Sequence, residues 1–383
     1  MNYQKPIVML KQAIVISLLF CPMFLSARQT ADSTLQTAYV LNVMHRVADW
    51  QLKTWESSGF AYPKVDWTNA ACYVGIYELG NISGNEKYLN SLQQIGNDLN
   101  WNTGARRFMA DDYCIGQVYA QMYMRYKDPK MIAAWKAQAD SIIVQPHNES
   151  LEWKNKIGLR EWAWCDALFM GPTSLAYLSK ATGDSKYLDA ASKLWWKSTE
   201  YLYNPEEKLY YRDQRFFGKK EKNGKPVFWS RGNGWVLAGL VRVLENMPDD
   251  HPDHQRFEKL YKDMADKIAS LQQSDGSWYA SLLDPESYNV KETSGTGFYC
   301  YALLWGVNRK LLDKKEYWPV IKKAWAALVS SVHPNGMLGY VQPIGDSPDK
   351  VNYNSTEVYG TGAFLLAGTQ LYHLLSAQGT SFE

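Results

Sequence analysis

The stretch WCDALFMGPTSLAYL, residues 164–178, decides the fold. After Asp166 nearly every position is apolar or small, so a helix formed here has no polar side that could face water. A helix that is apolar all round must be covered by other elements on every side. The rest of the chain therefore has to supply that cover.

Five further segments share this character and are rich in small and aromatic residues: 68–79, 112–126, 232–244, 295–307 and 360–375. Each of the six follows a more charged segment in which apolar residues recur every three or four positions, as in an amphipathic helix. These charged segments are 34–55, 87–99, 130–143, 186–203, 254–271 and 316–332. A helix with a single apolar stripe lies at a surface. The alternation predicts an all-α (α/α)6 barrel of six inner and six outer helices, packed as a closed solenoid.

The periodicity leaves two other arrangements open, an open α-solenoid and a pair of helical bundles. In the ring, glycines at inner positions would let the helices approach closely near the axis: Gly75, Gly116, Gly239, Gly306 and Gly368. The N-terminal ends of the inner helices would open at one face, together with the loops that precede them. We therefore expect the polar residues at those ends to converge at a mouth.

Charge and aromatic content limit the classes of partner. The chain of 383 residues has a net charge of +2 with scattered basic residues, so the sequence predicts neither a nucleic-acid-binding stripe nor an acidic tail. The partner is expected to be neutral or a small acid. The 16 Trp and 26 Tyr could stack on sugar faces and bond hydroxyls, although core packing accounts for most of them.

The N-terminus has the order of a secretory signal. Lys5 and Lys11 precede an apolar run at 13–25, and Ser26-Ala27 supply small residues at a cleavage site. The run is too short to predict a membrane span. We expect residues 1–27 to be removed and residues 28–383 to form one catalytic domain, secreted or periplasmic. A lipid anchor on Cys21 is the alternative.

The four cysteines that follow the signal are Cys72, Cys114, Cys165 and Cys300. None forms a CxxC pair, so the sequence predicts neither a zinc site nor a thioredoxin-type motif. Each lies in an apolar segment, where a free buried thiol is the commoner outcome.

Asp166 is the first candidate for chemistry, because it is a single carboxylate among aromatic and aliphatic residues. Poor solvation or a specific partner would shift its pKa into a range useful for proton transfer. The alternative is that Asp166 caps the helix that follows it. A second carboxylate at the mouth, Asp111 or Asp112, would complete the minimal pair for glycoside chemistry, in which one group delivers a proton and another tunes it or positions water.

The run FWSRGNGW, residues 228–235, is a poor cap, because Trp and Arg do not cap helices and two glycines are costly at a helix start. A guanidinium suits a carboxylate and an indole suits a sugar face. Arg231 with Trp229 and Trp235 therefore indicates a pocket for an acidic sugar. The alternative is an Arg stacked on Trp for packing alone.

Three ordered motifs, Trp-x-Asp-x-x-x-Met-x-Pro (164–172), Trp-x-Arg-Gly-Asn-Gly-Trp (229–235) and Glu-Thr-Ser-Gly-Thr-Gly (292–297), resemble those of the unsaturated rhamnogalacturonyl hydrolases and the related unsaturated glucuronyl hydrolases. The resemblance covers nearly the whole mature chain. It implies an (α/α)6 barrel that needs no metal or cofactor. It also implies a substrate left by polysaccharide lyases, an oligosaccharide with a 4,5-unsaturated uronic acid at its non-reducing end.

By that resemblance, Asp166 protonates C4 of the unsaturated ring and then helps to deprotonate water. Asp112 is favoured as the second carboxylate, since Asp111 can cap. Arg231 and Trp235 would hold the substrate carboxylate and stack on the sugar, with Trp164 beside the acid. The remaining candidates for substrate binding are Asp111, Met170, Trp229 and Thr296.

One departure from the family pattern is visible. Relatives often carry a His in the loop before the Arg motif, whereas this chain has Arg212 at about that place. An added cation could contact a second acid or a sulfate, so Arg212 is a further candidate for substrate binding and the identity of the glycan stays open. Two other functions also stay open: another (α/α)6 glycoside hydrolase or uronic-acid lyase, and a non-catalytic sugar-binding protein.

Overall fold

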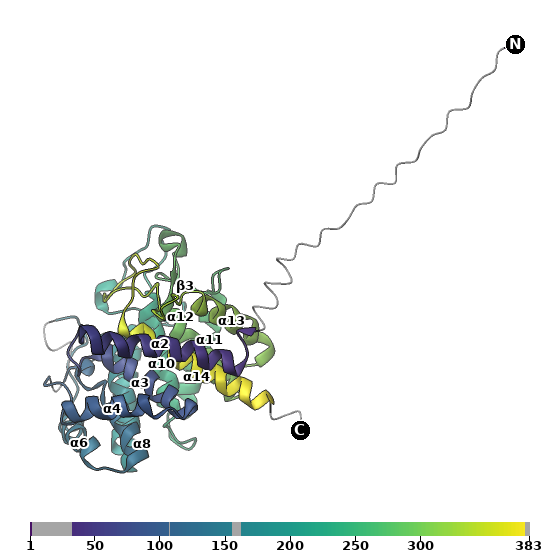
Figure 1. Ribbon diagram of the computed structural model, residues 1–383. Helices are drawn as coiled ribbons and strands as arrows, with labels where there is room; N and C mark the ends of the chain where they lie inside the picture. The colour runs from purple at the N-terminus through teal and green to yellow at the C-terminus, as the bar shows by residue number, and fades with distance from the viewer. Residues whose placement is uncertain (2–32, 107, 155–161, 380–383) are drawn as a thin grey trace.

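The computed structural model describes residues 1, 33–106, 108–154 and 162–379 (Figure 1). In these ranges twelve α-helices alternate between two layers. The inner helices are α3 (Trp67–Ser83), α5 (Gly116–Tyr126), α8 (Ala167–Thr182), α10 (Ser230–Leu244), α12 (Thr293–Asn308) and α14 (Val358–Gly379). The outer helices are α2 (Thr37–Ser58), α4 (Glu86–Asp98), α6 (Lys130–Ile143), α9 (Lys186–Leu202), α11 (His254–Ser270) and α13 (Lys314–Val329).

The inner helices form a closed ring. Each contacts the next along the chain, and the last, α14, packs against the first, α3. At the same place the outer helix α2 packs on the inner helix α14, so the first and last described helices lie together, as the purple and yellow ribbons show (Figure 1). This closure confirms the predicted (α/α)6 barrel and excludes both the open solenoid and the two bundles.

Burial separates the two layers as the sequence pattern predicted. Every residue of α12 from Thr293 to Val307 is buried. In contrast, α11 buries one stripe only, at Phe257, Leu260, Tyr261, Met264, Ala265 and Ile268. The spacing of three and four residues places that stripe on a single face.

Glycines allow the close approach of inner helices at two of the five predicted positions. A Cβ on Gly75 would lie 2.6 Å from the carbonyl oxygen of Gly362, and a Cβ on Gly239 would lie 2.7 Å from that of Leu168. The prediction was wrong for the other three, which face surrounding side chains. Gly116 faces Trp135 of α6, Gly306 faces Tyr261 of α11, and Gly368 faces Met44 of α2.

Short β-strands and 3-10 helices lie in the segments that connect the α-helices. Two antiparallel pairs are β1 (Tyr203–Asn204) with β2 (Leu209–Tyr210), in register Tyr203↔Tyr210, and β3 (Trp278–Tyr279) with β4 (Lys291–Glu292), in register Trp278↔Glu292. The 3-10 helices are η1 (Ala110–Tyr113), η2 (Gln214–Phe216) and η3 (Pro285–Tyr288). The helix predicted to start at residue 112 is thus divided into η1 and α5, because the main chain of Asp112 bonds Gly104 and its side chain bonds Arg106.

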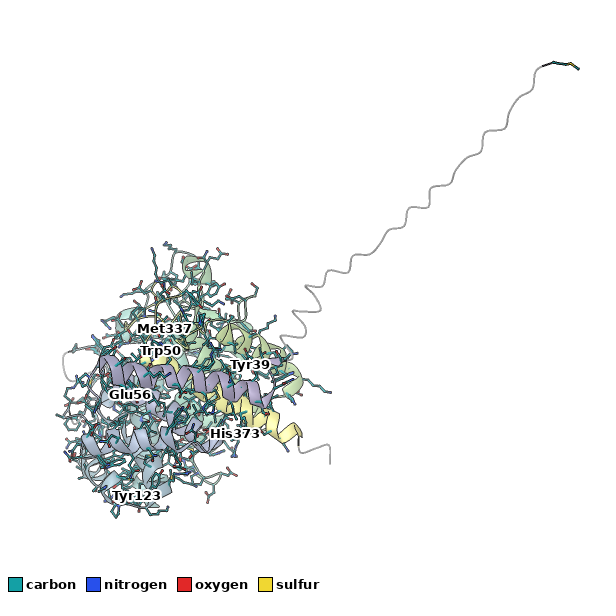
Figure 2. All side chains as sticks on the ribbon, viewed as in Figure 1. Tyr39, Trp50, Glu56, Tyr123, Met337 and His373 are labelled. Carbon is teal, nitrogen blue, oxygen red and sulfur yellow. The ribbon has the colours of Figure 1, made fainter. Side chains whose placement is uncertain are left out.

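The outer surface also ties distant segments together. The loop after α13 rests on α2, where the Arg46 guanidinium donates to the carbonyl of His333 at 3.0 Å; Met337 of this loop and Trp50 of α2 are labelled in Figure 2. The cysteines at 72, 114, 165 and 300 are buried and free. Among the described helices, none combines the length and the apolar run that a bilayer crossing requires.

Candidate active site

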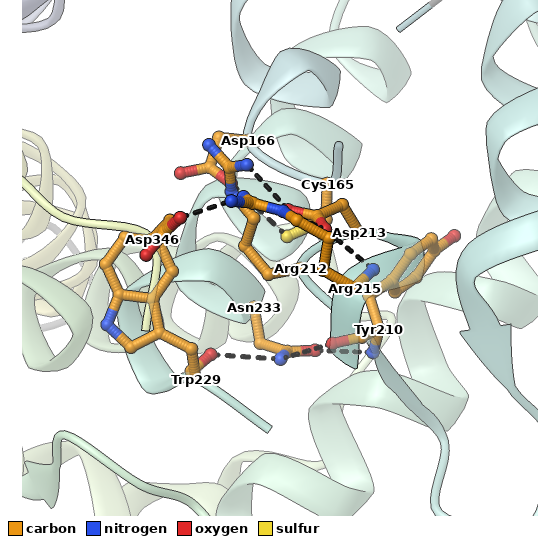
Figure 3. A network of polar contacts seen from close by, with 9 residues as sticks. All are labelled: Cys165, Asp166, Tyr210, Arg212, Asp213, Arg215, Trp229, Asn233 and Asp346. Carbon is orange, nitrogen blue, oxygen red and sulfur yellow. Dashed lines mark hydrogen bonds and ion pairs between the residues drawn. The ribbon is translucent and has the colours of Figure 1, made fainter. Parts of the chain in front are cut away.

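Asp166 occupies the N-cap position of α8, but its carboxylate makes no capping hydrogen bond. The residue is 9 % exposed. Its Oδ2 lies 3.4 Å from Nε of Arg212 and accepts a hydrogen bond from Sγ of Cys165 at 3.5 Å (Figure 3). The alternative that Asp166 serves as a helix cap is therefore wrong, and helix capping does not account for this carboxylate.

Burial raises the pKa of Asp166 above its ordinary value. The positive charges of Arg212 and Arg231 oppose that shift, and so does the hydrogen bond from Cys165. A carboxyl group whose pKa is raised by burial is harder to ionise, which suits a group that donates a proton in catalysis.

Asp112 is fully engaged by Arg106. The Asp112 carboxylate accepts three hydrogen bonds from Arg106: from its main-chain N–H at 2.7 Å, from its Nε at 3.0 Å and from its Nη2 at 2.5 Å. The carboxylate of Asp111, one position earlier, makes no hydrogen bond or ion pair with any described residue, although the main-chain carbonyl of Asp111 accepts from the N–H of Cys114 at 3.3 Å. Burial and the nearby charge of Asp166 raise the pKa of Asp111 to about 7, against an opposing effect of Arg212. The reason for preferring Asp112 was thus wrong, because Asp111 does not cap and Asp112 is the tethered residue.

Arg231 is buried, with 1 % of its surface exposed. Its Nη1 donates to the carbonyl of Gln342 at 2.7 Å and its Nη2 to that of Pro343 at 2.9 Å. The guanidinium lies between aromatic rings, 4.4 Å from the ring centre of Trp229 and 5.0 Å from that of Tyr359. The fork that was expected to hold a substrate carboxylate therefore holds the main chain of a mouth loop.

Trp235 is fully buried. Its ring packs against Phe169, Phe298, Trp67 and Tyr359. Such a ring supports the floor of the mouth and has no face for a sugar, which corrects the predicted stacking role. Trp164, Met170 and Trp229 are also buried, at 1–2 % exposure, and Trp229 donates its Nε1–H to Gln342.

The motif at 292–297 builds the start of α12. Thr296 donates its hydroxyl to the carbonyl of Glu292 at 2.6 Å and accepts from the main chain of Trp278 at 3.0 Å. The Glu292 carboxylate caps the helix and also accepts from the N–H of Gln342 at 3.1 Å. The structure therefore gives Thr296 a place in the scaffold, fully buried and away from the mouth surface.

Two partly exposed indoles at the mouth were not among the predicted site residues. Trp67 starts α3 and stacks on Tyr359 at 5.4 Å between ring centres. Trp153 lies edge-on to Trp164 at 6.4 Å and beneath two arginines. The position of Trp67 at an inner-helix start was a usable signal. Trp153 lies in an irregular segment after an outer helix, so its sequence context gave none.

Glu357, just before α14, is a further acid at the mouth. It accepts hydrogen bonds from the Tyr62 hydroxyl at 3.3 and 3.1 Å. Burial raises the pKa of Glu357, while the bond from Tyr62 and the charge of Arg231 oppose the shift. The starts of α3, α8, α10 and α14 and the η1 turn thus bring acids, arginines and aromatic rings to one face, as predicted for the mouth.

A closed double ring of helices with paired carboxylates and aromatic side chains at one mouth defines a carbohydrate-active enzyme of the (α/α)6 class. The chain belongs to Glycosyl Hydrolase Family 88, whose family model matches residues 43–375. It is therefore a glycoside hydrolase.

Two curated relatives carry the name unsaturated 3S-rhamnoglycuronyl hydrolase. The protein from Formosa agariphila is 41% identical over 328 residues, covering 82% of this chain and 86% of the relative. The protein from Alteromonas sp. (strain LOR) is 35% identical over 317 residues, covering 80% and 77%. A solved structure named as a polysaccharide lyase superposes with a TM-score of 0.80 at 30% identity, covering 89% of this chain and 98% of that one.

Proposed function

We propose that this glycoside hydrolase removes a 4,5-unsaturated uronic acid from the non-reducing end of lyase-generated oligosaccharides by adding water across C4=C5. The observation that carries the proposal is the buried carboxylate of Asp166, which caps no helix, lies 3.4 Å from Arg212 and interacts electrostatically with Asp111. The names of the two curated relatives supply the substrate class.

The double bond of such a sugar belongs to a vinyl ether. A proton delivered to C4 leaves a positive centre at C5 that the ring oxygen stabilises. Water then adds to C5 and returns its proton to a carboxylate, which leaves a hemiketal. Opening of the hemiketal forms a ketone at C5 and a hemiacetal at C1, which breaks down to an aldehyde and releases the aglycone as an alcohol. One water is consumed and the protons balance.

In this scheme Asp166 delivers the proton to C4 and takes it back from water, the dual task for which a raised pKa is suited. Asp111 is the second carboxylate, in place of Asp112, because its carboxylate is free and its pKa of about 7 lets it share protons with Asp166. Trp67 supplies a partly exposed indole for the sugar face. Arg231 supplies positive charge at the mouth and holds the loop at 342–343 in place.

We further propose that the aglycone is rhamnose with a sulfate at position 3, following the relatives' names. The test uses unsaturated glucuronyl-rhamnose with and without that sulfate. Preferential turnover of the sulfated disaccharide supports the assignment, and equal turnover of both contradicts it.

The function itself is tested by following the ultraviolet absorbance of the alkene. Incubation with an unsaturated disaccharide should remove the absorbance. Asp166→Asn should slow the decay by about 10²–10⁴-fold while binding persists, because the proton donor is lost. Binding without any decay in the wild-type enzyme would instead indicate a sugar-binding protein.

A polysaccharide lyase is the second candidate, favoured by the name given to one similar solved structure. A lyase creates the alkene, so absorbance would appear when the enzyme meets an intact uronic polymer. A hydrolase of the proposed type leaves the polymer unchanged. The two activities therefore change the same signal in opposite directions, on different substrates.

We also propose that the enzyme is exported, with residues 1–27 as the signal and 28–383 as one catalytic domain. Residues 2–32 lie outside the described ranges, so the proposal rests on Lys5, Lys11, the apolar run at 13–25 and Ser26-Ala27. Mass spectrometry of the N-terminus from an expressing bacterium tests it. A chain that begins near residue 28 supports export, a lipidated Cys21 supports the anchored form, and an intact Met1 contradicts both.

A further inference from the structure

A chain of alternating charges leads from the surface of the mouth to Asp166 (Figure 3). Asp346 pairs with Nη2 of Arg215 at 2.8 Å, and the same nitrogen donates to Asp213 at 2.8 Å. Asp213 also accepts from Nη1 of Arg212 at 2.7 Å. The Arg212 guanidinium then reaches Asp166, with Nε 3.4 Å from Oδ2. Arg212, the buried Asp213 and Arg215 thus connect Asp166 to the surface.

Asp213 is the anchor of this chain. It is 0 % exposed and accepts hydrogen bonds from the main chain and side chain of Arg215 as well as from Arg212. Although burial alone would raise it, these bonds from Arg215 and Arg212 hold the pKa of Asp213 below its ordinary value. Asp213 is therefore a fixed negative charge that orients both guanidinium groups.

The main chain fixes the same geometry. The N–H of Cys165 donates to the carbonyl of Arg212 at 2.8 Å, and Trp164 forms an antiparallel bridge with Asp213. The segment that carries Arg212 is thereby joined to the segment that carries Asp166. The ring of Trp153 covers Arg212 and Arg215, at 5.1 and 4.5 Å from its centre.

The contact between Arg212 and Asp166 differs in kind from that between Arg106 and Asp112. Arg106 makes hydrogen bonds that grip both oxygens of its carboxylate. The buried Nε of Arg212 reaches ion-pair distance from Asp166 but has no hydrogen-bond partner within the described residues. Asp166 is thus held by one nitrogen at 3.4 Å and by the Cys165 thiol at 3.5 Å, both on Oδ2, and its other oxygen has no hydrogen-bond partner within the described residues.

We propose that Arg212, anchored by Asp213, is a positioning residue that sets the protonation of Asp166 and does not bind substrate. The other groups that face Asp166 are Arg231 from α10, Asp111 from η1 and the Cys165 thiol of its own segment. Of the two arginines, Arg231 is committed to the carbonyls of Gln342 and Pro343, so Arg212 provides the ion pair. This inference deepens the proposed function and rests on it for the kinetic test.

The expected sign follows from charge. Arg212 favours the ionised form of Asp166, so its removal makes Asp166 harder to ionise. The proposed reaction begins with protonated Asp166, and the rate therefore falls where Asp166 loses its proton. In Arg212→Gln, the basic limb of kcat/KM should move to higher pH by about one unit, the lower end for an opposite charge at this distance. Arg212 also lowers the pKa of Asp111, so its removal makes both carboxylates harder to ionise. The basic limb is therefore expected to move to higher pH even if the two carboxylates titrate as a pair.

The experiment compares three variants by loss of alkene absorbance across pH. Arg212→Gln should shift the basic limb. Arg212→Lys keeps the charge and should leave the limb in place, but one ammonium cannot face both Asp166 and Asp213, so kcat should fall about tenfold. Arg215→Gln is the matched control, because it touches the same Asp213 and Trp153 without contacting Asp166, and its limb should match the wild type.

Two results would overturn the proposal. One is an unmoved basic limb in Arg212→Gln with a raised KM alone, which would make Arg212 a substrate-binding residue. The other comes from a measurement that needs no turnover, the titration of ¹³C-labelled aspartate carboxyl groups by NMR, with Asp166→Asn identifying the signal. An Asp166 titration that is the same in wild type and Arg212→Gln overturns the proposal even if no disaccharide is consumed, and a shifted one supports it. A wild-type enzyme that leaves the alkene intact counts against the proposed function instead.

Discussion

Asp111 lies within the influence of the Asp166 carboxylate: burial, together with that negative charge, raises the pKa of Asp111 from 3.8 to about 7. Two carboxylates whose charges interact in this way titrate as a coupled pair. Such a pair can give a proton to a substrate carbon and recover one from water without help from a third group.

The first prediction separates the two neighbouring aspartates. Asp111→Asn should reduce kcat by about 10²–10³-fold, because the partner of the acid is lost. Asp112→Asn leaves the pair intact but weakens the grip of Arg106, whose side chain is 64% exposed. This variant should lose about 1 kcal/mol of unfolding free energy and keep most of its turnover. Steady-state kinetics and urea unfolding of both variants test this prediction. A lower kcat in Asp112→Asn than in Asp111→Asn would instead identify Asp112 as the second carboxylate.

The second prediction concerns stability and pH. The unfolded chain releases the Asp111 proton near pH 3.8 and the folded chain near 7, so the folded state binds more protons between these values. The contribution of Asp111 to stability is therefore complete below about pH 3.8 and is lost as pH rises through about 7. Asn resembles the neutral acid, so Asp111→Asn should match the wild type near pH 4 and exceed it at pH 8, by on the order of 2–4 kcal/mol.

Urea unfolding of the wild type and Asp111→Asn at several pH values between 4 and 8 measures this difference. Asp112→Asn serves as the control, since it should be destabilised relative to the wild type. Parallel stability curves for the wild type and Asp111→Asn would show that Asp111 titrates alike in the folded and unfolded chain.

Most of the architecture could be predicted from the sequence, because the signals that specify it are local. A run such as 130–143 repeats its apolar residues at helical spacing, and α6 occupies those residues. The convergence of helix starts at one mouth follows from the closed ring alone. The helix that a given glycine faces could not be predicted in this way. Gly75 and Gly116 lie in similar runs of sequence, yet in the folded chain Gly75 faces the inner helix α14 and Gly116 faces the outer helix α6.

The site was harder to predict, because its decisive contacts join residues that are distant or lie in irregular turns. Arg231 finds its carbonyl partners more than a hundred residues later, and no local pattern shows that its fork is occupied. The choice between Asp111 and Asp112 depends on a loop that folds Arg106 back onto one of them. Asp213 could have been noticed, since a single acid between Arg212 and Arg215 at a predicted mouth is a compact charged cluster.

The third prediction tests the role of Arg231 as the anchor of the mouth loop. Lys at this position cannot donate to Gln342 and Pro343 with the geometry of a guanidinium. Arg231→Lys should therefore lower the unfolding free energy by about 1.5–3 kcal/mol and raise KM several-fold, because a loosened loop deforms the mouth. A raised KM with unchanged stability would show that Arg231 meets the substrate carboxylate directly. An unchanged KM would remove Arg231 from the site.

The fourth prediction concerns the closure of the ring. Gly75 of α3 faces Gly362 of α14, and a Cβ at position 75 would lie 2.6 Å from a main-chain oxygen. Because that oxygen belongs to a helix backbone, the helices must separate to accommodate Gly75→Ala, at a cost of about 3 kcal/mol or more. Gly345 is the matched control, since an added Cβ meets nothing closer than 3.8 Å and the change should stay within about 0.5 kcal/mol. The same seam positions the starts of α3 and α14, where Trp67 and Glu357 lie, so Gly75→Ala should lower kcat/KM as well as the unfolding midpoint. Equal unfolding midpoints for the two variants would mean that the contact between the first and last inner helices does not hold the barrel closed.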